Sequence, residues 1–159
     1  MVNELPPAAA RVQKAADALG LKVTVMIMPA STHTAEQAAA AAGTTVGQIV
    51  KSLIFQGKTS KKPYLLLVSG TNRVHEKAMA ERLGEPIVRP DATFVRDETG
   101  FAIGGIPPLG HDRKLVPYLD SDLLQYETVW AAAGTPNAVF EVSPQALKDA
   151  TGAVVVKVT

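Results

Sequence analysis

Glycine and proline crowd one short segment of this chain, residues 101–111, which reads Phe-Ala-Ile-Gly-Gly-Ile-Pro-Pro-Leu-Gly-His. Its three glycines permit positive φ angles and the close approach of another group to the backbone. Its two prolines fix φ and remove two N–H donors. We therefore expect a rigid loop that directly follows the end of a short buried strand. Such a loop could hold a ligand or a water molecule with backbone groups, although a tight turn without a function has the same composition.

Length and composition favour a single globular domain. The chain has 159 residues, of which 47% are hydrophobic, so residues 1–159 can form one domain with a substantial core. Cysteine is absent, which excludes disulfides, thiolate metal ligands and a cysteine nucleophile. We see no signal peptide and no apolar run long enough to cross a bilayer, so we expect a cytoplasmic protein that has no membrane partner.

The charges are unevenly distributed along the chain, although the formal net charge is only +1. Residues 44–90 contain eight Lys or Arg and three Asp or Glu, a net charge of +5, whereas residues 91–159 contain five and nine, a net charge of −4. A basic segment fits a polyanion such as a nucleic acid. An ordinary solvated surface is the alternative. The candidate phosphate contacts are Lys58, Lys61, Lys62, Arg73 and Lys77.

The pattern of apolar residues, caps and breakers predicts an α+β fold with a mixed sheet. Helices are predicted at residues 6–19, 35–42, 74–83, 90–100 and 144–150. Strands are predicted at residues 22–28, 49–55, 64–69, 114–119, 127–132, 138–142 and 154–158. Ser31 or Thr32 is the expected N-cap of the second helix, and Asn72 that of the third. Pro117 predicts that its strand lies at a sheet edge or a bulge.

Lys51 lies in the middle of a predicted strand, with apolar residues on both sides. A lysine in this position usually marks an edge strand or a solvent-facing side. A cation that faces a cleft is the alternative. Gly70 and Thr71 directly follow the next strand and precede a helix, an arrangement that weakly indicates an anion site at a helix N-terminus.

Four features, taken in order and spacing, resemble the YbaK/prolyl-tRNA-synthetase-associated editing domain family over residues 12–158. They are the strand lysine Lys51, Gly70 after the returning strand, a Gly-x-x-x-Pro loop within residues 104–110, and a turn at residues 133–137 before the last hairpin strand. The resemblance implies a mixed, partly rolled sheet flanked by helices. It also implies a deacylase that removes a wrong amino acid from tRNA in trans, commonly from proline tRNA, and that works without a metal, a cofactor or a covalent intermediate. An aminoacyl-tRNA synthetase is a further expected partner.

The chemistry of ester hydrolysis suggests roles for these residues. An ester is already activated, so its hydrolysis needs a positioned water and a donor for the developing oxyanion. We expect backbone groups of Gly104 and Gly105 to supply both, and Lys51 to anchor a phosphate or the carbonyl oxygen. His111 is either an acid or base, since its ordinary pKa is near neutrality, or a packing residue. Substrate contacts are expected from Ser52, Gly70, Thr71, Ile106, Pro107, Pro108, Gly134 and Thr135.

Two other functions remain possible from the sequence. One is a tRNA-binding module of the same fold that has lost hydrolysis. The other is an unrelated small-molecule hydrolase, which would need a nucleophile and base that we do not find; neither His33 nor His75 has metal-like spacing. Ser52 replaces the asparagine that often follows the lysine in relatives that remove alanine, so alanine specificity is not favoured. A small apolar or sulfur-containing side chain would suit a pocket lined by Met26, Met28, Ile106 and Leu109.

Overall fold

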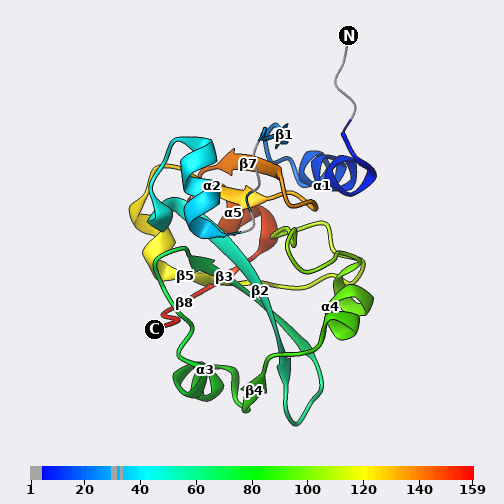
Figure 1. The fold of residues 1–159 in the computed structure, drawn as a ribbon. Helices are drawn as coiled ribbons and strands as arrows, with labels where there is room; N and C mark the ends of the chain where they lie inside the picture. Colours follow the sequence, from blue (N-terminus) through cyan, green and yellow to red (C-terminus); the bar gives the residue numbers. More distant parts are fainter. Residues whose placement is uncertain (1–4, 30–31, 33) are drawn as a thin grey trace.

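One mixed sheet organises the molecule, and the computed structural model describes residues 5–29, 32 and 34–159 (Figure 1). Its strands are β1 (Met26–Ile27), β2 (Ile49–Gly57), β3 (Pro63–Ser69), β4 (Ile87–Val88), β5 (Tyr118–Asp120), β6 (Val129–Ala132), β7 (Ala138–Val142) and β8 (Val154–Val156). The strand order is β1-β7-β6-β2-β3-β5-β8, and β4 pairs separately with β2. Parallel pairs join β2 to β6, β3 to β5 and β5 to β8, and the other pairs are antiparallel. The predicted α+β class with a mixed sheet is thus confirmed.

Helices cover both faces of this sheet. They are α1 (Pro7–Ala18), α2 (Ala35–Ala42), α3 (Glu76–Leu83), α4 (Ala92–Thr99) and α5 (Pro144–Thr151), with short 3-10 helices η1 (Val46–Gln48) and η2 (Ser121–Gln125). Side chains alternate along each strand, so the β2–β3 hairpin contributes to two cores. Val50 and Leu67 pack on the side of α1, α4 and α5. Phe55 and Leu66 pack on the side of α3, and α2 forms a smaller cluster with Ile49.

The helix ends follow the predicted stop signals closely, but two of the starts differ. Thr34 is the N-cap of α2 and forms a capping box with Gln37, so the prediction of Thr32 is wrong. The other predicted cap, Ser31, lies outside the described residues. His75, and not Asn72, is the N-cap of α3, because its ring nitrogen accepts the backbone N–H of Ala78. The C-caps of α2, α3, α4 and α5 are glycines with positive φ: Gly43, Gly84, Gly100 and Gly152.

In part of the predicted strand at residues 22–28, the backbone bonds to a side chain and not to a neighbouring strand. Gln13 of α1 donates to the carbonyl of Val23 and accepts from the N–H of Val25, over 2.9 and 2.8 Å. These bonds occupy backbone groups that a sheet partner would otherwise use. Only Met26–Ile27 therefore pairs as a strand, with β7.

Two predictions in and after the Gly/Pro segment differ from the structure: the strand end expected at residues 101–103 does not form, and the strand expected at residues 114–119 starts later and is not at an edge. Residues 101–103 form a bend and turn, in which Phe101 is buried and Ile103 is 60% exposed. The next strand begins only at Tyr118, directly after Pro117, and lies between β3 and β8. Proline is compatible with that interior strand because it precedes the first paired residue, and its carbonyl still accepts from Val154.

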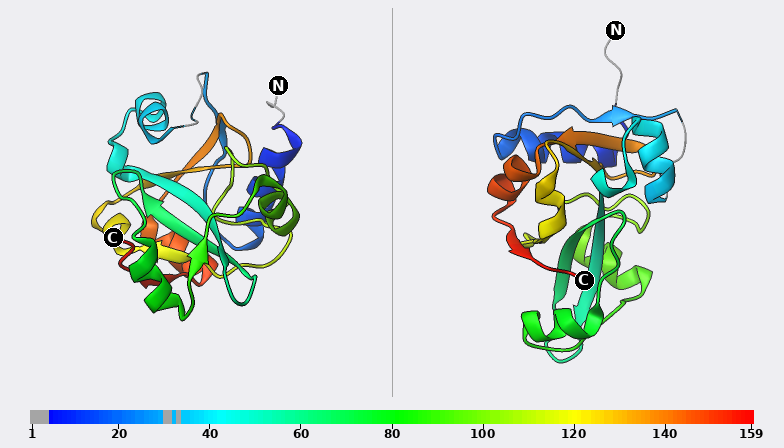
Figure 2. Two further views of the ribbon diagram at one scale, coloured as in Figure 1. Left: turned by 60° about the horizontal axis from the view of Figure 1, so that its bottom comes forward. Right: turned by 90° about the vertical axis from the view of Figure 1, so that its left-hand side faces the viewer.

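The long β2–β3 hairpin connects the two ends of the molecule (Figure 2). On one edge, β2 pairs with β3 from Val50 to Gln56 without a break in register. On the other edge, β6 pairs with β2 at Ile49 and Val50, and β4 pairs with it at Gln56 and Gly57. Within the part of the chain that the structure describes, residues 51–55 of β2 thus have a neighbouring strand on one side only.

Candidate active site

A pocket of about 500 Å³ lies at this gap beside β2. Residues 49–55 of β2 form its floor, and α2 and β6 flank one end. Residues 103–106 of the Gly/Pro segment and residues 89–90 after β4 also line it, together with Val95 of α4 and Val139 of β7. The pocket thus combines segments that are far apart in the sequence, and most of its surface is apolar. This volume is in the range of sites that bind small molecules.

Lys51 is half-buried and lines this pocket. Its strand β2 has an interior place in the sheet, but at Lys51 neither β6 nor β4 pairs with it, so this lysine lies at a local edge that borders a cleft. Its ammonium group donates a hydrogen bond of 2.5 Å to the carbonyl of Asn72. The pKa of Lys51 is lowered from its usual value, first by burial and then by the charge of Arg73, while Glu36 and Asp120 oppose that change. The cation is therefore partly desolvated, which strengthens its interaction with a bound anion or carbonyl.

Asp120, at the end of β5, positions the partner of Lys51. Its side chain is buried, and one carboxylate oxygen accepts from the N–H of Ser69 at 3.0 Å and from the side-chain amide of Asn72 at 2.8 Å. The same amide donates to Asp122 at 2.7 Å. Two carboxylates thus bind the side-chain amide of Asn72, and the main-chain carbonyl of the same residue binds Lys51. Nothing in the local sequence pattern identifies Asp120 or Asn72 in this role.

The Gly/Pro segment, residues 101–111, is hydrogen-bonded to the turn between β6 and β7. Gly105 accepts a hydrogen bond of 2.8 Å from the N–H of Gly134, and a Cβ on Gly105 would approach the nitrogen of Thr135 to 2.8 Å. Gly104 has a φ of +105°, a conformation that strongly favours glycine. Gly104, Gly105 and Ile106 line the pocket, whereas Gly134 and Thr135 brace the loop.

His111 closes the end of the loop. Its Nε2 lies 2.6 Å from the carbonyl of Pro107, which can only accept, so this nitrogen carries the hydrogen. Its ring also packs edge-on against Phe101, with the centroids 5.7 Å apart. Burial lowers the pKa of His111, which the hydrogen bond to Pro107 opposes. Pro107 and Pro108 are buried, and the loop residues that line the pocket end at Ile106.

The other predicted substrate contacts divide into two groups. Ser52 lines the pocket, and its hydroxyl is buried without a hydrogen-bond partner among the described residues. Gly70 instead packs against η1, so closely that an added Cβ would collide with the carbonyl of Val46. Thr71 is exposed, and α3 begins at Glu76, two residues later than the predicted start at residue 74, so Gly70 and Thr71 lie further from the helix N-terminus than expected.

Several lining residues are not apparent from the sequence. Arg89 lies at the pocket with its guanidinium 5.5 Å from the ring centroid of Phe55 and 3.6 Å from Glu76. Arg89 lies beside β2 because it directly follows β4, which pairs antiparallel with β2. Trp130 of β6 also contributes. Of the four residues expected as pocket walls, Ile106 is one, whereas Met26 lies in β1, Met28 follows that strand, and Leu109 packs in the main core.

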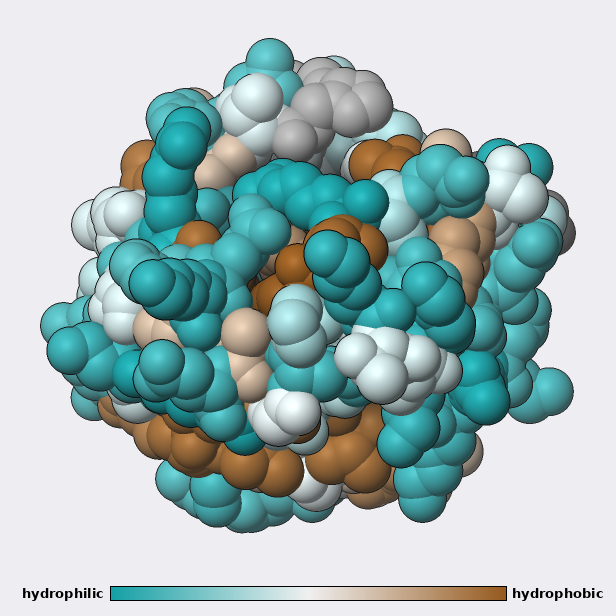
Figure 3. All heavy atoms as spheres, turned by 90° about the horizontal axis from the view of Figure 1, so that it is seen from below, coloured by the Kyte–Doolittle hydropathy of each residue, from teal (hydrophilic) through white to brown (hydrophobic). Residues whose placement is uncertain are grey.

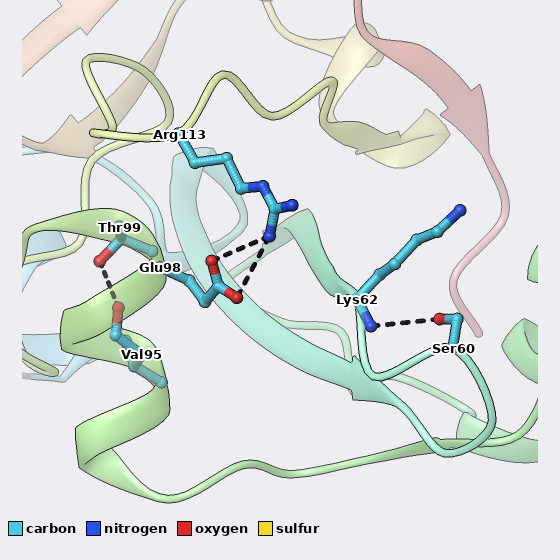
Figure 4. Close-up of polar contacts among 6 residues, drawn as sticks. All are labelled: Ser60, Lys62, Val95, Glu98, Thr99 and Arg113. Atoms are coloured by element: carbon cyan, nitrogen blue, oxygen red, sulfur yellow. Dashed lines mark hydrogen bonds and ion pairs between the residues drawn. The ribbon is translucent and has the colours of Figure 1, made fainter.

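The candidate phosphate contacts are all exposed. Lys58, Lys61 and Lys62 lie at the turn of the β2–β3 hairpin, and Figure 4 shows the side chain of Lys62 extending away from that turn while its N–H bonds to Ser60. Arg73 precedes α3 and Lys77 lies on it. Seen from below, most of this end of the molecule is hydrophilic, with apolar patches near the centre and along the lower edge of the view (Figure 3).

The hairpin turn itself is held in place. Glu85 accepts the backbone N–H groups of Thr59 and Ser60 over 3.0 and 2.8 Å, together with the hydroxyls of Ser60 and Tyr64. These hydrogen bonds, led by those from Ser60, lower the pKa of Glu85 to about 2. The lysines are thus presented on an ordered turn. On the neighbouring surface, Arg113 reaches α4 and pairs with Glu98 at 3.0 Å (Figure 4).

Metal-binding clusters and membrane spans are not found in the described part of the chain. There, no three His, Cys, Asp or Glu side chains gather in an arrangement that could hold a metal ion. His33 lies outside this part. No helix among the described residues is both long and apolar enough to cross a bilayer.

The structure is an α+β fold in which a lysine and a glycine-rich loop line one largely apolar pocket. Comparison with known proteins identifies the family. The aminoacyl-tRNA editing domain model matches residues 29–150, and the chain belongs to that family. The chain is similar to a solved structure provisionally described as a trans-editing enzyme for prolyl-tRNA synthetase. That likeness has 48% identity and a TM-score of 0.92 and covers 98% of this chain and 99% of the other.

Two curated relatives are more distant. The uncharacterized protein YwhH of Bacillus subtilis is 32% identical over 121 residues, which cover 75% of each chain. A protein of Enterococcus faecalis, EbsC, provisionally named a Cys-tRNA(Pro)/Cys-tRNA(Cys) deacylase, is 26% identical over 128 residues, covering 79% of this chain and 76% of EbsC. The family and these likenesses support an aminoacyl-tRNA deacylase activity.

Proposed function

We propose that this protein is a trans-editing deacylase that hydrolyses the ester of a mischarged aminoacyl-tRNA, with proline tRNA as the expected acceptor. The observation that carries the proposal is the meeting of Lys51 with Gly104 and Gly105 on one pocket. Family membership supports the reaction class. The description of one relative names prolyl-tRNA synthetase, and that of another names Cys-tRNA(Pro), which favours proline tRNA as the acceptor.

In the proposed mechanism, the amino acid enters the pocket and the terminal adenosine stays at its mouth. The ammonium group of Lys51 binds the terminal phosphate or the ester carbonyl. Backbone groups of residues 103–106 hold the attacking water and stabilise the oxyanion, a task that preorganised dipoles perform best where water is excluded. The ribose hydroxyl of the substrate relays the proton to the leaving oxygen. No metal ion enters this scheme.

The charge of the hairpin end suggests how tRNA approaches. Lys58, Lys61 and Lys62 are exposed at the hairpin turn, and Arg73 and Lys77 are exposed at α3. Arg89, a further cation, lines the pocket itself. Contacts from such residues to phosphates would orient the acceptor end without reading its sequence.

Deacylation of proline tRNA charged separately with alanine, cysteine and proline tests the proposal. We expect the wild type to release at least one of these amino acids, and Lys51→Ala to lower that rate by about two or more orders of magnitude while remaining folded. Lys14→Ala, at an exposed position on α1, is the matched control and should retain the full rate. Tight binding of charged tRNA without release of any amino acid would instead favour the non-catalytic tRNA-binding module.

A further inference from the structure

We propose that the unpaired edge of β2 inside the pocket binds the free α-amino group and the carbonyl of the substrate, as a neighbouring strand would. This inference rests on the proposed deacylase function and specifies its substrate class as esters of α-amino acids whose amino group is free. It follows from the hydrogen-bonding pattern of β2 and from what adjoins each end of the gap.

The backbone groups of β2 alternate between its two edges. Gly57 donates to the carbonyl of Lys62 on the β3 side, over 2.9 Å, whereas Lys58 donates to Pro86 on the β4 side, over 2.8 Å. The register between β2 and β3 runs without a bulge. Since the N–H and C=O of one strand residue point to the same edge, odd-numbered residues of β2 face β3 and even-numbered ones face the other edge.

Ser52 and Ile54 are the even-numbered residues inside the gap. Pairing with β6 stops at Val50, and pairing with β4 starts at Gln56. Pro90, which follows β4 and lines the pocket, has no N–H to extend that ladder. Within the described residues, the N–H and C=O groups of Ser52 and Ile54 therefore have no strand partner, and both residues line the pocket.

Unpaired backbone groups in a largely apolar pocket favour a ligand that offers both a donor and an acceptor. An aminoacyl ester carries an ammonium donor and a carbonyl acceptor on adjacent atoms, like the N–H and C=O of one strand residue. Binding to the β2 edge would use main-chain hydrogen bonds for affinity and leave the side chain to the apolar walls, as in peptides that extend a sheet. The ester would then lie in a pocket that residues 103–106 also line.

Amide hydrogen exchange provides the first test, with controls in the same strand. In the free protein, the amides of Ser52 and Ile54 should exchange faster than those of Lys51 and Leu53, which bond to β3. An aminoacyl-adenosine analogue with an amide in place of the ester should slow exchange at Ser52 or Ile54 and leave Lys51 and Leu53 unchanged. Binding that alters only residues 103–106 would overturn the inference.

A substrate series provides the second test. The best aminoacyl-tRNA substrate is compared with the same tRNA after its α-amino group has been converted to a hydroxyl group. Loss of a charged hydrogen bond should reduce kcat/KM by about tenfold or more. Equal rates for the two esters would overturn the inference while leaving the deacylase intact. Failure to hydrolyse any aminoacyl ester would instead count against the proposed function itself.

Discussion

The ammonium nitrogen of Lys51 lies 2.5 Å from the carbonyl oxygen of Asn72, on a segment 21 residues further along the chain. The side chain of Asn72 is bound in turn to the buried carboxylate of Asp120. The main-chain oxygen of Asn72 thus positions the ammonium group of Lys51. Asp120, which does not line the pocket, holds Asn72 in place through its side chain. The position of Lys51 should therefore be sensitive to changes at Asp120.

Asp120→Asn should lower the deacylation rate about tenfold and destabilise the fold by about 1–3 kcal/mol, because it weakens a buried carboxylate that accepts three hydrogen bonds, from Ser69, Asn72 and Asp122. Since Asp120 raises the pKa of Lys51, its neutralisation should lower that pKa further, which competitive labelling of lysines can measure. Asp122→Asn is the control, because the exposed side chain of Asp122 accepts from the same Asn72 amide but is not buried, so its neutralisation should have a smaller effect. An unchanged pKa and rate in Asp120→Asn would contradict the positioning role.

Gly105→Ala should reduce activity more than His111→Ala does. The added Cβ would meet the backbone of Gly134 and Thr135 within 3 Å and displace the loop from the pocket. Gly104→Ala should also impair activity, because its φ of +105° is unfavourable for alanine. Steady-state kinetics at a temperature where all variants are folded would measure the order. A loss of two to four orders of magnitude in His111→Ala alone would assign acid–base chemistry to the imidazole.

Stability should fall as the pH drops below about 6.5, because burial lowers the pKa of His111 from that ordinary value. The unfolded chain then binds a proton that the folded one resists, and stability rises with pH wherever the unfolded state holds more protons. One such group contributes at most about 1.4 kcal/mol per pH unit. Denaturant unfolding of wild type and His111→Gln between pH 7 and 5 should show a slope in the wild type that is reduced in the variant. Glu85, whose pKa is about 2, affects stability only at lower pH, below its ordinary value of 4.5.

Reversing Lys61 and Lys62 to Glu should weaken tRNA binding and reduce its salt dependence, because fewer counterions are released on binding. Hydrolysis of a minimal aminoacyl-adenosine ester should be unaffected, since both lysines lie outside the pocket lining. The control is the same double reversal at Lys14 and Lys22, two exposed residues near the N-terminus. Equal tRNA affinity of the two double variants at low salt would identify the hairpin end as an ordinary solvated surface.

Local signals in the sequence predicted the helices and strands that depend on near neighbours. Ser143 and Pro144 begin α5, and Gly100 ends α4 just before the Gly/Pro segment, as expected. The strands of the β2–β3 hairpin and of the β6–β7 hairpin were predicted for the same reason. These features follow from φ preferences and side-chain caps, which act over a few residues.

The tertiary structure alone decided the surroundings of each candidate site residue. A lysine in mid-strand is compatible with a sheet edge or with a cleft. Lys51 lines a pocket because β6 stops pairing with β2 at Val50 and β4 starts pairing with it only at Gln56, which leaves a space beside β2. Similarly, the contact between Gly105 and Gly134 and the hydrogen bonds of Asn72 join segments about 30 and 50 residues apart. The amino-acid pattern of a segment determines which local structures it can adopt. The packing of distant segments determines which of its polar groups are left for a ligand, because each group's partner comes from elsewhere in the chain.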